Sequence, residues 1–188
     1  MVTMRSPRAD YPELRVARFK KNAGQTAAMI AGLRLARGER IVTMDADGQN
    51  DPADIPLLLG MLKEHPAAFG VRVKRRDTPA RRFASWFANG VRNRLLRTDL
   101  RDTGCSLKAF RREAVPELPP FKGMHRFVPS FTMMKGYKGV EVPVNHRPRE
   151  RGVSKYPAFG RAIPALLDCL MVRRMQRNLS RYEIEEDR

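Results

Sequence analysis

The sequence is poor in cysteine and has no long apolar run. Its 188 residues include two cysteines, Cys105 and Cys169, which lie far apart and form no CxxC pair. This excludes a disulfide framework and favours a reducing, cytosolic setting. No uncharged apolar run approaches the ~20 residues that span a bilayer, and residues 1–10 lack the apolar segment of a secretory signal. Any membrane contact is therefore expected to be peripheral or made through partner chains.

Acidic residues are also scarce. The chain has 37 Lys and Arg against 20 Asp and Glu, which gives a formal net charge of +17. A field of this sign attracts polyanions, and the candidates are nucleic acid, anionic lipid headgroups and phosphorylated substrates. The sequence has no zinc-finger spacing, no RNP-like aromatic motif and no clear helix-turn-helix. No nucleic-acid partner is therefore expected, although a basic nucleic-acid-binding protein stays an alternative.

The chain does contain enough apolar residues for one folded domain, since they make up 42% of the sequence. Periodicity and turn signals predict, in order, a strand over 14–19, a helix over 25–37, a strand over 40–44, a helix over 52–64 and a strand over 67–73. This alternation indicates an α/β fold with a mostly parallel sheet flanked by helices. In such sheets, ligands bind beyond the carboxyl ends of the strands.

The second half of the chain ends in an amphipathic helix. Its predicted elements are a basic helix over 79–97, a strand or loop over 103–110, a short helix over 126–135, a strand over 139–145, a charged loop over 147–156 and a helix over 159–177. The apolar stripe of this last helix consists of Ile163, Leu166, Leu167, Leu170 and Met171, beside Arg173 and Arg174. The stripe either packs on the sheet or lies in a membrane interface. The expected organisation is an irregular start over 1–13, a partial domain over 14–158, the helix, and a polar tail over 178–188.

The most informative segment is an acidic turn directly after the predicted strand 40–44. Asp45 and Asp47 stand at i and i+2, so their side chains point the same way in extended geometry. Mg²⁺ or Mn²⁺ prefers oxygen ligands and is often shared with substrate phosphates, and Gln49 offers a further oxygen. Asp51 is expected to cap the following helix, with Pro52 at its first position. Two aspartates at this spacing also occur by chance, so the pattern alone does not decide for a metal site.

Further motifs surround this turn in a specific order. They are NAGQ at 22–25, DADGQNDP at 45–52, DTGCSLK at 102–108, HRFVP at 125–129 and NHRPRERGVSKY at 145–156. In this order they resemble family 2 glycosyltransferases with the GT-A fold, and within them the dolichyl-phosphate mannose synthase and undecaprenyl-phosphate glycosyltransferase branch. The resemblance covers roughly residues 14–177, which is nearly the whole chain.

This resemblance implies a transferase that moves a sugar from a nucleotide-diphosphate sugar to a polyprenyl phosphate. Asp45 and Asp47 would be its catalytic aspartates and, with Gln49, would hold Mg²⁺ or Mn²⁺ and the diphosphate. The acceptor phosphate would be bound by Arg126, Arg149, Ser154 and Lys155. The enzyme would be cytoplasmic and peripheral to the inner or plasma membrane, in contact with the anionic membrane surface.

The sequence departs from the family pattern at its start. Family members carry two strands with nucleotide-binding loops before the strand expected at 14–19, and this chain has no counterpart of them. We therefore expect an N-terminally truncated GT-A domain with an exposed sheet edge, which favours association or low solubility. A catalytically inactive remnant of the family is the alternative that this departure favours.

Overall fold

The computed structural model describes residues 11–73, 79–147 and 162–178. The helices are α1 (Gly24–Leu35), α2 (Ile55–Met61), α3 (Pro79–Leu96), α4 (Val128–Met134) and α5 (Ala162–Arg177). The strands are β1 (Arg40–Thr43), β2 (Ala67–Arg72), β3 (Lys108–Arg111) and β4 (Gly139–Val144). Short 3-10 turns are η1 (Pro52–Asp54), η2 (Arg112–Ala114) and η3 (Met124–Phe127).

The strands of the described part of the chain form one mixed sheet in the order β1-β3-β2-β4. Strands β2 and β4 pair in parallel, whereas β3 lies antiparallel between β1 and β2. Strands β1, β2 and β4 therefore run in the same direction, and β3 alone is reversed. The predicted α/β class is confirmed, with a sheet that is partly parallel.

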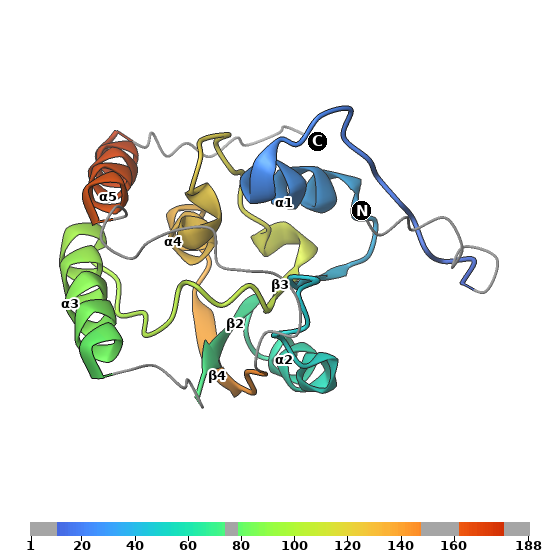
Figure 1. Ribbon diagram of the computed structural model, residues 1–188. Helices are drawn as coiled ribbons and strands as arrows, with labels where there is room; N and C mark the ends of the chain where they lie inside the picture. Colours follow the sequence, from blue (N-terminus) through green and yellow to red (C-terminus); the bar gives the residue numbers. More distant parts are fainter. Residues whose placement is uncertain (1–10, 74–78, 148–161, 179–188) are drawn as a thin grey trace, which may run out of the picture.

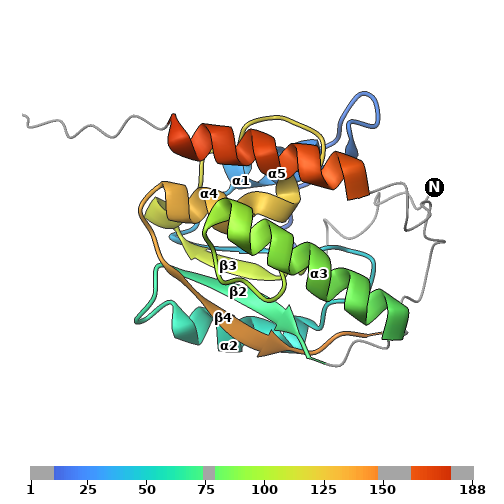
Figure 2. The ribbon, with the colours of Figure 1, turned by 90° about the vertical axis from the view of Figure 1, so that its left-hand side faces the viewer.

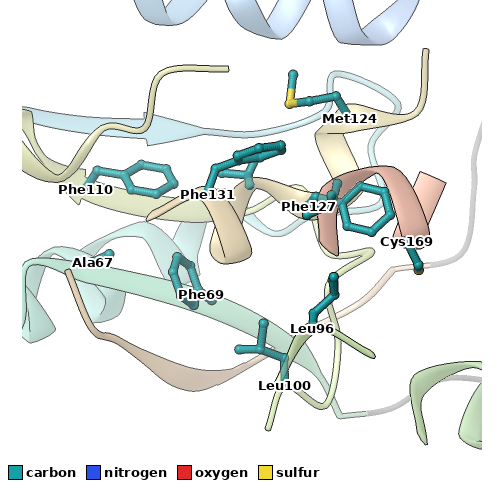
Figure 3. Close-up of a cluster of buried hydrophobic side chains, with 11 residues drawn as sticks. Ala67, Phe69, Leu96, Leu100, Phe110, Met124, Phe127, Phe131 and Cys169 are labelled. Atoms are coloured by element: carbon teal, nitrogen blue, oxygen red, sulfur yellow. The ribbon is translucent and has the colours of Figure 1, made fainter. Parts of the chain in front are cut away.

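The sheet carries helices on both faces, because successive strand residues point to opposite sides. Ala67, Phe69 and Phe110 belong to a core cluster with Leu96, Phe127, Phe131 and Val172, and so face α3, α4 and α5 (Figure 3). The intervening residues Ala68 and Ala109 pack on the other side with Leu58 and Leu62 of the α2 region. Figure 1 shows the resulting layers, with α2 on one side of the sheet and α1, α4, α3 and α5 on the other.

The strand predicted over 14–19 is wrong. These residues have no regular structure and are mostly exposed, although the helix after them begins close to the predicted residue. Alternating apolar residues form a strand only where another strand offers hydrogen bonds, and no described strand pairs with this segment. The segment is instead attached to the end of α1 by a hydrogen bond from Arg15 Nη1 to the carbonyl oxygen of Leu35, 2.7 Å long.

The structure tests one of the two expectations for the apolar stripe of α5, namely that the stripe packs on the sheet. Cys169 and Val172 are buried, whereas Leu166, Leu167 and Leu170 are exposed. The helix therefore packs through a neighbouring face, and these leucines do not rest on the sheet. The predicted loop 147–156 lies outside the described residues from position 148 onward, as does the predicted tail from 179.

Candidate functional site

The acidic turn lies where the sequence predicts it, directly beyond the carboxyl end of β1. Asp45 is half-buried, and its backbone N–H donates to Ser106 Oγ over 3.2 Å. Its carboxylate accepts from Gln25 Nε2 at the start of α1, with distances of 3.0 and 3.1 Å to the two oxygens. The first aspartate is thus oriented from both sides.

The second aspartate shapes the turn itself. Asp47 Oδ1 accepts a hydrogen bond from the backbone N–H of Gln49 over 3.1 Å, which is an Asx turn. The Gln49 side chain reaches His146, with 3.4 Å between the two Nε2 atoms. Asp45, Asp47 and Gln49 therefore stand on one tight turn, as the sequence predicts.

The side-chain oxygens of the acidic turn suit a cation that is shared with substrate better than a metal ion held by the protein alone. No group of three or more His, Cys, Asp or Glu side chains within the described residues forms a site that could hold a metal ion. Two carboxylates and one amide oxygen are hard ligands, but they are too few for the near-octahedral shell of Mg²⁺. A cation here would need oxygens from substrate phosphates and water to complete its shell.

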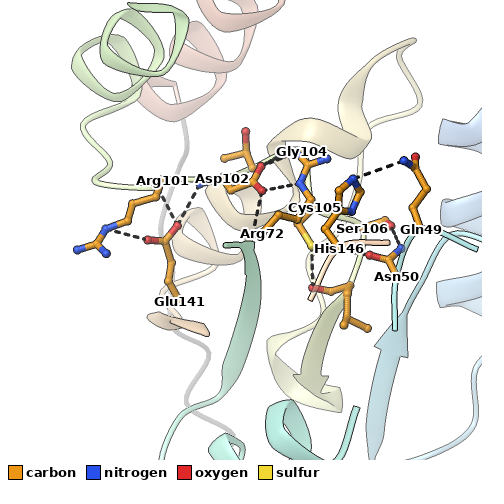
Figure 4. Close-up of polar contacts among 12 residues, drawn as sticks. Gln49, Asn50, Arg72, Arg101, Asp102, Gly104, Cys105, Ser106, Glu141 and His146 are labelled. Carbon is orange, nitrogen blue, oxygen red and sulfur yellow. Dashed lines mark hydrogen bonds and ion pairs between the residues drawn. The ribbon is translucent and has the colours of Figure 1, made fainter. Parts of the chain in front are cut away.

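Ser106 is the centre of the hydrogen bonds that fix this turn, and Figure 4 shows its contact with Asn50. Its Oγ accepts from the backbone of Asp45 and, over 2.7 Å, from Asn50 Nδ2. Its carbonyl accepts from Thr43 Oγ1 over 2.8 Å. One buried serine thus contacts the end of β1 and both ends of the acidic turn. Sequence reasoning missed this role, although the motif at 102–108 contains the residue.

The loop that carries Ser106 is itself firmly anchored. Asp102 accepts a bidentate pair from Arg72, with Nε–Oδ2 of 2.7 Å and Nη2–Oδ1 of 2.8 Å. Glu141 of β4 accepts from the backbone N–H of Arg101 over 2.7 Å. Gly70 of β2 lies so close to the loop that an added Cβ would be 2.8 Å from the carbonyl oxygen of Leu107. Strands β2 and β4 therefore position the loop beneath the acidic turn.

One buried and one half-buried ionisable group lie beside the turn. Lys108 is fully buried, donates to the carbonyl of Cys105, and has its pKa lowered to about 8 by burial. Burial likewise lowers the pKa of His125, whose Nδ1 lies 3.2 Å from Thr26 Oγ1 on α1. The charge of Asp45 opposes both shifts. Both groups therefore lie within the electrostatic reach of the acidic turn.

The segment that leads into the predicted acceptor loop is fastened to this turn. Asn50 and His146 form an antiparallel bridge, and the backbone N–H of Arg147 donates to the carbonyl of Gln49 over 2.9 Å. The Arg147 guanidinium also pairs with Asp51 at 2.7 Å. Arg149, Ser154 and Lys155 themselves lie outside the described residues.

Arg126, the remaining predicted acceptor residue, contacts α5. Its Nη2 lies 3.0 Å from Asp168 Oδ2, and its Nε donates to the carbonyl of Gly123 over 3.3 Å. The charge of Asp45 acts on the pKa of the adjacent residue, His125. Arg126 is thus held at the junction of η3 and α5 by an ion pair that the sequence did not indicate.

A groove of about 320 Å³ extends from the acidic turn along β1. Its lining is apolar on the α1 and β1 sides and includes Met29, Gly32 and Ile41, with Gln25, Asp45 and Ser106 at its polar end. Such a concave site with a few convergent polar groups is typical of small-molecule binding.

Comparison with known proteins assigns the chain to a family. Residues 4–118, more than half of the chain, match the sequence profile of Glycosyl transferase family 2. The chain belongs to glycosyl transferase family 2. The family expected from the motifs is therefore confirmed.

One curated family relative is the dodecaprenyl-phosphate galacturonate synthase of Rhizobium johnstonii. It is 40% identical over 164 residues, which cover 85% of this chain and 48% of the relative. The chain therefore spans about half the length of the curated relative that it matches.

Solved structures with a similar fold include two sugar-transferring synthases. Mannosyl-3-phosphoglycerate synthase of Rubrobacter xylanophilus has a TM-score of 0.57 at 16% identity, over 85% of this chain and 54% of that one. Glucosyl-3-phosphoglycerate synthase of Mycobacterium tuberculosis, in complex with Mn²⁺, uridine diphosphate and phosphoglyceric acid, has a TM-score of 0.54 at 17% identity, over 88% and 57%. These likenesses confirm the expected GT-A fold.

Proposed function

We propose that this chain forms the catalytic part of a glycosyltransferase that transfers a sugar from a nucleotide-diphosphate sugar to a polyprenyl phosphate. Membership of glycosyl transferase family 2 supports glycosyl transfer. The name of the Rhizobium johnstonii relative, which combines a polyprenyl phosphate with a sugar acid, supports the class of acceptor. The observation that carries the proposal is the contact between the acidic turn and the segment entering the acceptor loop, through Asn50 and His146.

On the donor side, Asp45, Asp47 and Gln49 are proposed to hold a divalent cation, Mg²⁺ or Mn²⁺. When bound, this cation would neutralise the charge that develops on the leaving nucleoside diphosphate. Asp45 is restrained by Gln25 and Ser106, so its carboxylate is oriented before substrate arrives. The Mn²⁺ complexes of the Mycobacterium tuberculosis synthase with uridine-diphosphate-glucose support this class of cofactor and donor.

On the acceptor side, Arg149, Ser154 and Lys155 are proposed to bind the phosphate of the lipid, with Arg126 joining them. Guanidinium forks bind phosphate bidentately, and lysine adds a point charge. A phosphate oxygen is already ionised near neutral pH, so this nucleophile needs no strong general base. Arg147 supports the arrangement, because it ties the start of this loop to the turn that carries the donor ligands. We place the reaction at the cytoplasmic membrane face.

The test is isothermal titration of the 188-residue chain with Mn²⁺ and a panel of nucleotide sugars, repeated with Asp47→Ala. We expect metal-dependent binding of at least one nucleotide sugar and a loss of about tenfold or more in the variant, since each charged ligand contributes well over 1 kcal/mol. The control is Thr98→Ala, which removes the hydrogen bond from Thr98 Oγ1 to Asn93 Oδ1 after the end of α3. This variant should bind like the wild type. Absence of binding by the wild-type chain would support an inactive remnant instead.

A further inference from the structure

Helices α3 and α5 lie side by side and run in the same direction (Figure 2). Their last turns are joined by a hydrogen bond from Gln176 Nε2 to the carbonyl of Leu96, 3.1 Å long. Leu96, Cys169 and Val172 enter the same core cluster. Each helix therefore buries one face against the core and leaves another facing outward.

The outward faces carry large apolar side chains. Trp86 and Phe87 of α3 are 70% and 62% exposed, and Leu166, Leu167 and Leu170 of α5 are 44%, 60% and 48% exposed. Because the helices run in parallel, these residues, which lie near the middle of each helix or before it, are on neighbouring stretches of the helix pair. Single exposed apolar residues are ordinary, whereas a group of five on two adjacent helices marks an interaction surface.

Basic side chains follow the apolar group toward the ends of both helices. Arg94 of α3 and Arg174 and Arg177 of α5 are exposed. Leu170, Arg173, Arg174, Arg177 and Asn178 line a hollow of about 480 Å³. Within the described part of the chain, Arg174 and Arg177 form no ion pair, so their charges are available to an external anion.

We propose that this surface, the α3–α5 face of Trp86, Phe87, Leu166, Leu167, Leu170, Arg174 and Arg177, docks on an anionic lipid membrane. Tryptophan and phenylalanine insert at the boundary between headgroups and acyl chains, and adjacent arginines bind headgroup phosphates. The net charge of +17 adds a long-range attraction to the same surface. RNA would match the arginines but would leave the leucines in water, so a membrane is the better partner.

The inference deepens the proposed function, on which it rests for its biological role. A polyprenyl phosphate lies in a bilayer, so the acceptor must be reached from a membrane-facing surface. Asp168 of α5 pairs with Arg126 at 3.0 Å, which joins the proposed membrane helix to a residue of the proposed acceptor site. Docking of the α3–α5 face would thus position Arg126 relative to the lipid.

The first experiment uses Trp86 as a local probe, because it is the chain's single tryptophan. Its fluorescence is recorded while vesicles of phosphatidylcholine, with or without phosphatidylglycerol, are added to the 188-residue chain. We expect a blue shift and quenching by brominated acyl chains with the anionic vesicles only. Co-sedimentation without any change in Trp86 emission would show binding through another surface and would overturn the proposal.

The second experiment compares matched variants by co-sedimentation with the same anionic vesicles. Arg174→Gln with Arg177→Gln should weaken binding about 30-fold, at ~1 kcal/mol for each arginine. Phe87→Ser with Leu167→Ser should weaken it by about tenfold or more. The controls Leu57→Ser on α2 and Arg34→Gln on α1 remove exposed side chains elsewhere, and their binding should stay close to that of the wild type.

Three further outcomes would overturn the docking proposal. Equal weakening by the controls would show that the effect is not specific to the α3–α5 face and would overturn the proposal. So would concentration-dependent dimerisation that the α3–α5 variants abolish, or tight RNA binding without vesicle binding. Because no nucleotide sugar is present, vesicle binding that persists when the donor titration fails would overturn the proposed function alone.

Discussion

Arg147 and Asp51 form an ion pair with 2.7 Å between Nη2 and Oδ2. Asp51 also accepts from the backbone N–H of Ala53 over 3.0 Å, and so caps the turn that leads into α2. One carboxylate therefore joins the segment entering the acceptor loop to the segment that leaves the acidic turn. The two motifs lie almost one hundred residues apart in sequence, and this pair brings them together.

The two roles of Asp51 can be separated by substitution. Asp51→Ala removes both the cap and the ion pair, and should lower the free energy of unfolding. Asp51→Asn keeps a capping oxygen and should cost clearly less, because a half-exposed ion pair contributes little. Urea unfolding of both variants measures the difference. Equal losses would show that the cap is unimportant here.

The pKa of Asp51 gives the sign of its pH dependence. The Ala53 N–H, and then Arg147, lower this pKa below its ordinary value of 3.8. The contribution of Asp51 to stability is therefore present above that value and is lost as the pH falls through the folded-state pKa. The stability difference between the wild type and Asp51→Asn should accordingly shrink in acid.

Ser106 should be a positioning residue for the proposed cation site. Ser106→Ala leaves the Asp45 N–H and the Asn50 amide without their acceptor, so we expect weaker Mn²⁺ binding, by about five- to tenfold, for a loss of ~1–1.5 kcal/mol. Ser106→Thr should restore much of the affinity because it keeps the hydroxyl. Mn²⁺ titration monitored by electron paramagnetic resonance measures both.

A buried serine elsewhere provides the matched control. Ser130 of α4 is buried, and its hydroxyl has no hydrogen-bond partner in the described structure. Ser130→Ala should leave Mn²⁺ affinity unchanged. If it reduces affinity as much as Ser106→Ala does, the effect reflects general destabilisation and the positioning role is refuted.

The sequence predicts what depends on local signals. The cap at Asp51, the strand that ends before Asp45 and the helix after Gly24 all follow from neighbouring residues, and the structure confirms them. The segment 14–19 has the correct alternation but no partner strand, and pairing is a property of the sheet rather than of the segment.

The site contacts that the sequence did not predict are long-range. Ser106 reaches Asp45 across 61 residues, and Arg126 reaches Asp168 across 42. Serine and arginine have no periodicity that would indicate such partners, and the contacts exist only because β3 pairs with β1 and η3 packs against α5 in the core. The order of the motifs was enough to predict the family, whereas the hydrogen bonds that support the site could be found only in the folded structure.

Lys108 should make stability depend on pH in the alkaline range. Burial lowers its pKa from 10.5 to about 8, with Cys105, Asp102, Asp45 and Arg72 as its charged or titratable neighbours. Between pH 8 and 10.5 the unfolded chain binds more protons at this residue, so native stability rises with pH in that window, by about 3 kcal/mol in all. Below pH 8 this contribution is constant.

The measurement compares the wild type with Lys108→Met by chemical unfolding at several pH values. The stability of the wild type should rise relative to the variant from pH 8 to pH 10. Lys63→Met, which removes an exposed lysine, is the control and should give parallel curves. A constant difference between the wild type and Lys108→Met would contradict the lowered pKa.

Both thiols should be unreactive in the native protein. Cys105 and Cys169 are free and buried, and burial raises the pKa of each above its ordinary value. The thiolate, which is the reactive species, is therefore scarce as well as inaccessible. Ellman's reagent should label neither thiol within minutes at pH 7.5, and both in denaturant. Rapid native labelling of Cys105 would show that the 102–108 loop opens.

Two glycines should respond in opposite directions to the same substitution. Gly32 lies in the interior of α1, and an added Cβ there would meet no atom within 4 Å. Gly32→Ala should therefore stabilise the protein by about 0.5–1 kcal/mol through helix propensity. At Gly70, the same Cβ would lie 2.8 Å from the Leu107 carbonyl oxygen, so Gly70→Ala should destabilise by about 1–3 kcal/mol. Thermal unfolding compares the stabilities of the two variants. Because Gly70 lies close to the loop that carries Ser106, only Gly70→Ala should also weaken Mn²⁺ binding. Stabilisation by both substitutions would mean that the loop tolerates displacement, and that Ser106 does not need its observed position to hold the acidic turn.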